Sequence, residues 1–320
     1  MTSVPPLVSV IVPCYRVTAF IVEALEALRA QSFRDFETIV VNDGCPDTEA
    51  LEQVLVPYRS EITYIKQENR GLSGARNTGL EAARGPLVAL LDGDDVWNPN
   101  YLEVQVAYLR EHPEVDVVYP NAVFIGETTW NGRIFRDMFP SRGDVTVHSL
   151  LSRECIVNVS VTGRRGTFLK VGLFDIELRS GEDWDIWLRM AKAGSRLAYH
   201  DHVLYQYRVR KGALSSDKLN LPRAGMAVLN KFLRRQDLAD EERQLALRVL
   251  RDYRAQLSFI QGRIAVYRGN RREAISHLTQ ANEVVQNWRL GAAILMLRVA
   301  PWLLYRIIHR RYPSEYEFLH

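Results

Sequence analysis

Short apolar segments alternate with segments of helical spacing from Leu7 to Asp95. The apolar, β-branched runs are Val8–Val12, Glu37–Val41, Ile62–Lys66 and Leu87–Leu91. The segments of helical spacing between them are Ala19–Ala30, Thr48–Tyr58 and Gly74–Ala83. Such an alternation predicts an α/β fold, in which a mainly parallel sheet is covered by helices on both faces.

The pattern becomes less regular after residue 95. We predict a helix over Tyr101–Leu109, a strand over Val115–Tyr119 and a hairpin tip at Trp130–Gly132, within an irregular stretch from Asn121 to Gly166. Further on, the spacing predicts a helix over Asp183–Ala193 and strands over Arg196–His200 and Val203–Tyr207.

The character of the chain changes near residue 219. The remaining segments have helical spacing: Arg223–Arg235, Asp240–Tyr267, Arg271–Val285 and Trp288–His309. We therefore predict two parts, an α/β domain over residues 1–218 and an α-helical C-terminal region over residues 219–320, with the boundary at Lys218–Pro222.

Composition and charge exclude several classes of protein. A net charge of +3 over 320 residues is too small to indicate a nucleic-acid partner. Cys14, Cys45 and Cys155 match neither a metal-binding nor a disulfide spacing, which suits a reducing compartment. The first residues lack the basic and apolar segments of a secretory signal, so we expect a cytoplasmic protein.

Polar loops follow four successive strands of the predicted sheet. They are Pro13–Arg16, Asn42–Gly44, Asn69–Gly71 and Asp92–Asp95. Any one of them is explained by turn chemistry alone. Ligands of parallel α/β sheets bind at the carboxyl ends of the strands, however, and four such loops in succession indicate a binding site there.

The acidic run Asp92-Gly93-Asp94-Asp95 is the most informative of these loops. It places three carboxylates within four residues, directly after an apolar strand. Carboxylates this close repel one another unless a cation lies beside them, and Mn²⁺ or Mg²⁺ prefers such oxygen ligands together with substrate phosphates. Alone, the run is also compatible with a solvated turn.

Six ordered blocks between residues 7 and 210 resemble the family 2 glycosyltransferases, which have the GT-A fold. The blocks are Val10–Tyr15, Ile39–Gly44, Asn69–Gly79, Leu90–Asp95, Gly172–Asp175 and Gly181–Arg189. Two departures from the family pattern are visible. The second block reads Asn42-Asp43-Gly44-Cys45 instead of Asp-Asp-Gly-Ser, and Arg16 replaces the usual Asn.

The resemblance implies roles in donor and metal binding for residues at the strand ends. The residues that would bind the nucleotide-sugar are Pro13, Tyr15, Asp43, Arg76, Asp92 and Gly93. An acceptor at Asp43 suits the imide N–H of uracil, which favours a UDP-linked donor, although Asp43 could equally be a turn or helix-capping residue. Asp94, with Asp92, would bind Mn²⁺ or Mg²⁺, and Gly93 would let the backbone approach the ligand.

The pair Glu182-Asp183 supplies the candidate general base. The resemblance implies that Asp183, ahead of Glu182, takes the proton of the acceptor hydroxyl in an inverting displacement. Acidic residues in the first turn of a helix are also stabilised by its dipole without any chemistry. The basic residues of Gln206–Gly212 either close over the diphosphate or form a solvated loop.

The C-terminal region offers one further prediction. Gln261–Val285 resembles a single tetratricopeptide-type hairpin, although a solenoid needs about three such units. Residues 288–311 contain five arginines and no acidic residue, and Arg298 and Pro301 interrupt the apolar run of about 18 residues that a spanning helix needs. Two interpretations remain, a helix that contacts the inner face of the membrane peripherally and a packed helix with a basic edge.

The sequence thus predicts an inverting, metal-dependent glycosyltransferase. It would transfer a sugar from a nucleotide-sugar to a hydroxyl of a glycan or lipid-linked acceptor, in polysaccharide or glycolipid assembly. Two alternatives remain open, a sugar-phosphate nucleotidyltransferase and a non-catalytic scaffold. The run Pro13–Val17 lacks the glycine-rich loop of the first, and the acidic residues Asp92, Asp94 and Asp183 argue against the second.

Overall fold

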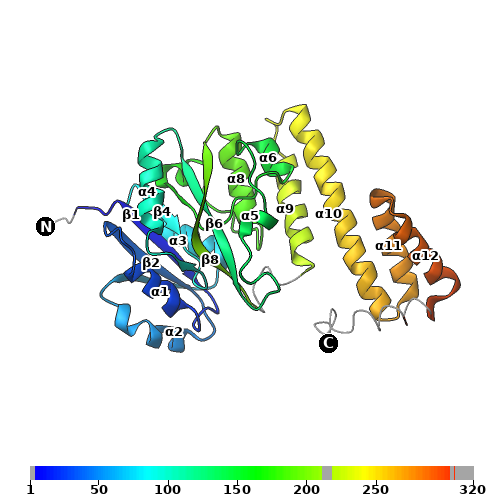
Figure 1. The fold of residues 1–320 in the computed structure, drawn as a ribbon, viewed down its shortest axis with the longest axis horizontal. Helices are drawn as coiled ribbons and strands as arrows, with labels where there is room; N and C mark the ends of the chain where they lie inside the picture. Colours follow the sequence, from blue (N-terminus) through cyan, green and yellow to red (C-terminus); the bar gives the residue numbers. More distant parts are fainter. Residues whose placement is uncertain (1–3, 211–217, 303–305, 307–320) are drawn as a thin grey trace. The chain divides into compact units, whose positions relative to one another are not determined.

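A computed structural model describes residues 4–210, 218–302 and Arg306 (Figure 1). The chain divides into two compact units, Met1–Ser216 and Asp217–His320. The first unit holds the sheet and the second consists of helices, so the change of pattern along the sequence corresponds to a change of architecture.

The first unit is built on an eight-stranded sheet of order β3-β2-β1-β4-β7-β6-β8-β5. Its strands are β1 (Val8–Cys14), β2 (Phe36–Asp43), β3 (Ile62–Gln67), β4 (Leu87–Leu90), β5 (Val96–Trp97), β6 (Val117–Gly126), β7 (Thr162–Arg164) and β8 (Leu197–Val209). β3, β2, β1 and β4 pair in parallel, as do β6 and β8, whereas β7 and β5 pair antiparallel to their neighbours. The predicted α/β fold with a mainly parallel sheet is confirmed.

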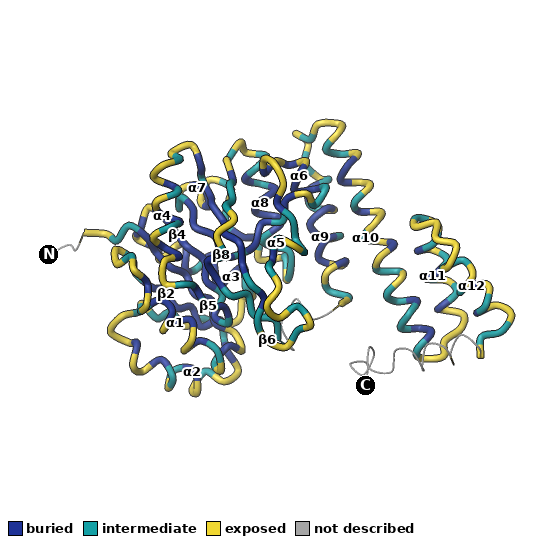
Figure 2. The backbone as a smooth tube through the Cα atoms, viewed as in Figure 1, coloured by how far each residue is buried: buried dark blue, intermediate teal, exposed yellow. Residues whose placement is uncertain are grey.

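Helices cover both faces of this sheet. They are α1 (Ile21–Arg29), α2 (Thr48–Val54), the 3₁₀ turn η1 (Val56–Tyr58), α3 (Gly71–Ala82), α4 (Tyr101–Glu111), α5 (Phe135–Met138), α6 (Val147–Leu151), α7 (Arg165–Lys170) and α8 (Glu182–Lys192). Val10 packs in one core with Leu25 of α1 and Leu102 of α4. The next residue, Ile11, points to the other face and touches the backbone of α3, where a Cβ atom on Gly79 would collide with it. Buried residues therefore concentrate along the central strands (Figure 2).

Two predicted elements differ from the observed ones for identifiable reasons. The helix expected over Thr48–Tyr58 ends at Val54 and continues as a 3₁₀ turn, because Pro57 has no N–H to donate to a helical bond. The strands expected over Arg196–His200 and Val203–Tyr207 are one strand, β8, whose register against β6 shifts near Asn121. The polar residues between the two apolar runs lie at this irregularity.

The second unit contains four helices among the described residues: α9 (Asn220–Leu233), α10 (Asp240–Tyr267), α11 (Arg271–Val285) and α12 (Trp288–Val299). α10 and α11 pack closely, because Gly262 leaves room for the side chain of Leu278. α12 is shorter than the predicted helix Trp288–His309, since the backbone leaves the helical conformation at Ala300, before Pro301. Of the remaining predicted segment, residues 303–305 and 307–311 lie outside the described residues. None of the described helices is long and apolar enough to span a membrane.

Candidate functional site

The polar loops that follow β1, β2 and β4 meet at one edge of the sheet. The three strands are parallel neighbours, so their carboxyl ends point the same way. A Cβ atom on Gly93 would lie 3.1 Å from the carbonyl oxygen of Pro13 and 3.0 Å from Val17. Glycine suits position 93 because the end of β1 and the loop after it pack directly against this residue. This packing is a second reason for glycine, beside the predicted approach of the backbone to a ligand.

Arg76 connects this edge to the start of α8. Its side chain is fully buried, and its two terminal nitrogens donate to Asp92 Oδ1 and Glu182 Oε1, each at 2.8 Å. Its guanidinium also lies 5.4 Å from the centre of the Phe174 ring. The predicted metal loop and the predicted general-base pair are thus joined by one buried arginine, although Arg76 lies on a helix where a surface position would be usual.

The electrostatics of this ion-pair chain follow from its burial. Burial alone would lower the pKa of Arg76, but Asp92 and Glu182 raise it above its ordinary value and keep the residue charged. Burial raises the pKa of Glu182 to about 7, against the opposing effect of Arg76. The Nε of Arg76 is buried and has no hydrogen-bond partner in the described part of the chain. One N–H donor of this buried cation is therefore unused by the described residues, which is rare for a buried polar group.

Asp183 differs from Glu182, its neighbour at the start of α8. Asp183 is partly exposed and accepts a hydrogen bond from the backbone N–H of Trp184 at 2.7 Å. Burial raises the pKa of Asp183 above the ordinary aspartate value, while the Trp184 N–H, Arg76 and Arg153 act in the opposite direction. An accessible carboxylate with a raised pKa at the start of a helix is suited to accept a proton.

The acidic loop is closed on its other side by two arginines, Arg208 of β8 and Arg210, which directly follows that strand. The Nε of Arg210 donates to Asp94 Oδ2 at 2.6 Å, and the backbone N–H of Arg208 donates to Asp95 Oδ1 at 2.8 Å. The side chain of Arg208 also donates to the carbonyl oxygen of Asp94 and to Glu23 of α1. Basic residues of the segment Gln206–Gly212 thus lie on the acidic loop, and the last two residues of that segment fall outside the described chain.

Asp43 and Tyr15 occupy the neighbouring strand ends. Asp43 is buried, and its Oδ1 accepts hydrogen bonds from Gln67 Nε2 at 2.7 Å and from the backbone N–H of Arg70 at 2.8 Å. The N-cap position of α2 is taken by Asp47, whose side chain makes no capping hydrogen bond, so Asp43 is not the N-cap residue. Tyr15 exposes 41 % of its surface, and the guanidinium of Arg16 lies 5.4 Å from its ring centre.

The two departures from the family pattern also lie beside this strand end. Asn42 Oδ1 accepts the backbone N–H of Cys45, and the Cys45 sulfur accepts the backbone N–H of Arg16 at 3.1 Å. Asn42 and Cys45 therefore order the loops after β1 and β2, a role that concerns loop shape and leaves Asp43 in place.

Two further motif residues hold the segment that leads into α8. Asn77 of α3 donates to the carbonyl oxygen of Phe174 and accepts its N–H, at 2.8 and 2.9 Å. Arg189 pairs with Asp185 at 2.8 Å and donates to the carbonyl oxygens of Val171 and Leu173. These residues shape the site without facing it.

The donor set of the acidic loop suits a divalent cation held jointly with a substrate. Among the described residues, no group of three or more His, Cys, Asp and Glu side chains converges as a complete metal site. Asp92 pairs with Arg76 and Asp94 pairs with Arg210. Each carboxylate still has oxygen lone pairs that could bind a cation. Neither carboxylate by itself supplies enough ligands to hold one. Mn²⁺ and Mg²⁺ are commonly bound by one or two carboxylates plus phosphate oxygens and water, which fits this arrangement.

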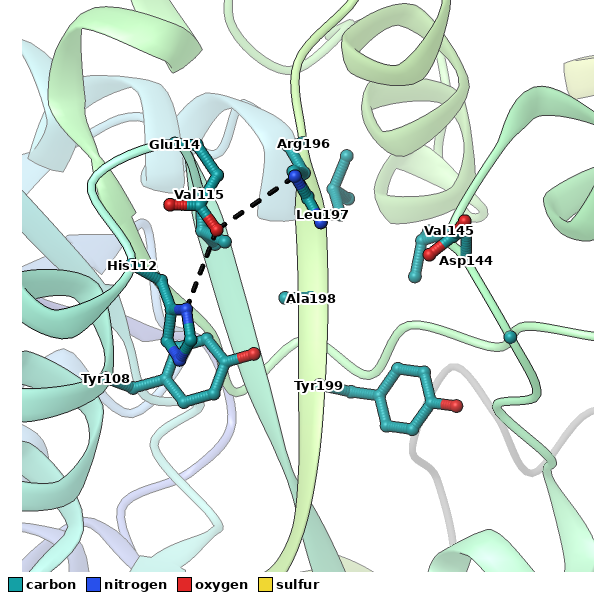
Figure 3. Close-up of a pocket in the computed structure, with 11 residues that line it drawn as sticks. Tyr108, His112, Glu114, Val115, Asp144, Val145, Arg196, Leu197, Ala198 and Tyr199 are labelled. Carbon is teal, nitrogen blue, oxygen red and sulfur yellow. Dashed lines mark ion pairs between the residues drawn. The ribbon is translucent and has the colours of Figure 1, made fainter.

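A separate cavity of about 220 Å³ opens at the beginning of β8 (Figure 3). Tyr108 and Tyr199 line it, and Glu114 forms ion pairs there with His112 and Arg196. β8 carries its lining residues at one end and the acidic-loop arginines at the other, roughly 30 Å apart along an extended strand. The cavity is therefore not part of the site at the acidic loop.

Comparison with protein families and curated proteins gives a consistent result. The family model described as "Glycosyl transferase family 2" matches residues 9–156. An uncharacterized glycosyltransferase RT0329 of Rickettsia typhi is 30% identical over 239 residues, which cover 72% of both chains. The uncharacterized glycosyltransferase EpsJ of Bacillus subtilis is 31% identical over 220 residues, covering 66% of this chain and 63% of EpsJ.

Solved structures share the fold over nearly the whole chain. TarS 1-349 of S. aureus, in complex with UDP-GlcNAc, superposes with a TM-score of 0.65 and 22% identity, covering 96% of this chain and 91% of TarS 1-349. The mannosyltransferase PcManGT of Pyrobaculum calidifontis, in complex with GDP-Man and Mn²⁺, gives a TM-score of 0.62 and 19% identity, covering 98% and 89%. At these identities the likeness concerns the fold.

Replacing Arg76 by Ala should leave the buried Glu182 and the half-buried Asp92 without a counter-ion. Removing one partner of a buried ion pair typically lowers the free energy of unfolding by about 3–5 kcal/mol. The loss should be larger at pH 8 than at pH 5.5, because a protonated Glu182 no longer needs a cation. Denaturant unfolding at both pH values tests this, with Arg251→Ala as the control, since its exposed ion pair with Asp252 is worth under about 1 kcal/mol. Equal effects of the two variants would contradict the prediction.

Proposed function

The chain belongs to glycosyl transferase family 2, and we propose that this glycosyltransferase moves a sugar from a UDP-linked donor to a hydroxyl of a glycan or lipid-linked acceptor, with inversion at the sugar carbon. The observation that carries the proposal is the buried chain Asp92–Arg76–Glu182, which ties the donor loop to the base. Family membership decides against the nucleotidyltransferase alternative. Assembly of a surface polysaccharide or glycolipid is the process we expect it to serve.

The donor would bind at the ends of β1, β2 and β4. Tyr15 offers an exposed ring for the base, and α3 opens beside the site with no side chain of the described residues capping its first turn, which suits an anion. Both hydrogen bonds to Asp43 use Oδ1, which leaves Oδ2 for the imide N–H of uracil. This last feature is why we favour UDP over other nucleotides, since the structural relatives have been solved with both UDP-GlcNAc and GDP-Man.

Asp94, with Asp92, would hold the Mn²⁺ or Mg²⁺ ion. When bound, such an ion supplies positive charge against the diphosphate leaving group. Arg76 provides a fixed positive charge beside the same loop whether or not an ion is present, because its burial and its two acidic partners leave it no freedom to turn away. A charge held in place before the reaction costs no reorganisation when the leaving group forms.

Asp183 would act as the general base. Its carboxylate would accept the proton of the acceptor hydroxyl while that oxygen attacks the anomeric carbon and the bond to the diphosphate breaks. A single displacement of this kind inverts the configuration and needs no protein nucleophile. Glu182 is engaged by Arg76, so we assign it to positioning that arginine, and Asp183 remains the residue with an accessible carboxylate.

We further propose that α12 makes the peripheral membrane contact. The helix is apolar on two faces: Ile294 and Leu297 are buried, whereas Trp288, Leu295 and Val299 are 76%, 60% and 74% exposed. A helix that is apolar on all sides is normally buried on all sides. The exposed apolar face of α12 is therefore available to be covered by another apolar surface.

The charges around this face suit an anionic bilayer. Arg289, Arg298 and Arg306 are exposed, and α12 contains no acidic residue. The guanidinium of Arg289 lies 5.5 Å from the ring centre of Trp288, an arrangement of cation and aromatic that fits the interfacial region of a membrane.

Replacing Asp183 by Asn should reduce turnover by at least about 100-fold, which is the usual contribution of a general base. Binding of UDP, measured by calorimetry, should stay within a factor of two, because a general base acts on the acceptor hydroxyl and not on the nucleotide. In the unchanged enzyme, kcat should fall as the pH drops toward the raised pKa of Asp183, since only the ionised carboxylate accepts a proton. Asp137→Asn, an exposed residue of α5, is the control. Normal turnover of Asp183→Asn would refute the assignment.

Removal of divalent metal should abolish transfer and weaken UDP binding. We expect EDTA to stop release of UDP from a UDP-sugar and Mn²⁺ or Mg²⁺ to restore it, because the carboxylates of the acidic loop otherwise repel the diphosphate. Asp94→Asn should lose the Mn²⁺-dependent part of UDP affinity in calorimetry. Full activity in EDTA would show that Arg76 and Arg210 alone neutralise the leaving group.

The membrane contact can be tested by flotation with liposomes that contain phosphatidylglycerol. We expect the full chain to float with anionic liposomes and to remain at the bottom with neutral ones. A double change, Leu295→Glu with Val299→Glu, should abolish flotation and leave the buried side of α12 intact. Leu247→Glu, an exposed apolar position of α10, is the matched control. If the double variant floated as well as the unchanged protein, α12 would not be the membrane contact, and the helix would serve only in packing.

A further inference from the structure

Arg153 has a backbone conformation that arginine rarely adopts. It follows Ser152, the residue that ends α6, and has a φ of +64°. The position after a helix end that requires a left-handed backbone is normally taken by glycine, because a side chain there meets the preceding carbonyl. An arginine at this place indicates that its side chain is used, since glycine would fit the backbone better.

The Arg153 side chain is placed beside the candidate general base. Its guanidinium lies 5.0 Å from the ring centre of Trp184, the residue after Asp183. Trp184 is held in turn by its Nε1, which donates to the carbonyl oxygen of Leu150 at 3.1 Å, within α6. The helix that precedes Arg153, α6, and the helix that carries Asp183, α8, are therefore fastened together at this point.

Arg153 differs from the other arginines around the site. Arg76, Arg189, Arg208 and Arg210 all donate to carboxylates or carbonyl oxygens. Within the described chain, no hydrogen bond or ion pair engages the guanidinium of Arg153, which is half-buried. Its positive charge is also among the influences that oppose the rise in the pKa of Asp183, in keeping with its position against Trp184. A cation is thus held next to the base with its N–H donors uncommitted.

We propose that Arg153 binds an anionic group, a phosphate or a carboxylate, that the acceptor carries close to the hydroxyl to be glycosylated. The inference rests on the proposed function, because the hydroxyl must reach Asp183 to lose its proton. A group beside that hydroxyl then lies within reach of Arg153. The planar guanidinium donates two parallel hydrogen bonds to either kind of anion, a geometry that lysine does not offer.

The experiment compares three small acceptor mimics by saturation-transfer NMR, each with and without UDP. They are methyl glucoside, methyl glucuronide and glucose 6-phosphate, which are neutral, a carboxylate and a phosphate. The test variant is Arg153→Gly, chosen because glycine suits the left-handed backbone and should leave the melting temperature equal or higher. Arg110→Gln, an exposed arginine of α4, removes the same charge elsewhere.

We expect at least one anionic mimic to give a signal that falls five-fold or more in Arg153→Gly and is unchanged in Arg110→Gln. The mimic that binds tells whether the acceptor anion is a phosphate or a carboxylate. Arg153→Lys should recover only part of the signal, and the UDP affinity of every variant should match that of the unchanged protein.

Three results would overturn the inference. The first is that the unchanged protein binds neither anionic mimic. The second is that Arg153→Gly binds an anionic mimic as well as the unchanged protein does. The third is that the unchanged protein binds the neutral mimic as well as the anionic ones. If Arg153 only supported Asp183 electrostatically, the second result would be seen, and the pH dependence of UDP-sugar hydrolysis would shift in Arg153→Gly. Failure of the proposed function is seen separately, as absence of UDP binding in all variants.

Discussion

The burial of one positive charge is the constraint on which the site depends. Arg76 is fully buried, and an unpaired cation in such a place costs several kcal/mol or more. It is retained because two carboxylates from distant parts of the chain, Asp92 and Glu182, converge on it. Those two contacts fix α3, the loop after β4 and the start of α8 relative to one another, so the donor loop and the base are positioned by the same side chain.

The acidic residues around Arg76 differ in the positive charges that they contact. Asp92 and Glu182 share the buried arginine as their counter-ion, and Asp94 pairs with Arg210. Asp183 forms no ion pair among the described residues and is only half-buried. Neighbouring carboxylates can therefore serve different roles, a consequence of environment and not of residue type.

The comparisons and the geometry support the conclusion at different levels. Sequence relatives place the chain in a family, and structural relatives at 19–22% identity show that the whole described architecture recurs. Fold alone does not specify the reaction, because one fold hosts many chemistries. Donor, metal and acceptor therefore rest on the particular residues at the strand ends, where Tyr15, Asp43 and Asp94 remain predictions about ligand contact.

The sequence by itself determined the alternation of strands and helices, the parallel sheet and the clustering of polar loops at its edge, because hydrophobic period and loop composition are local properties. It also singled out Asp92, Asp94 and Asp183. The tertiary structure alone decided which charges pair. Arg76 and Glu182 are 106 residues apart, Arg210 lies 116 residues from Asp94, and Arg153 reaches Trp184 from the end of another helix. Such pairs depend on strand order and on how helices pack, and no spacing within the chain encodes the distance between two side chains that only the folded sheet brings together.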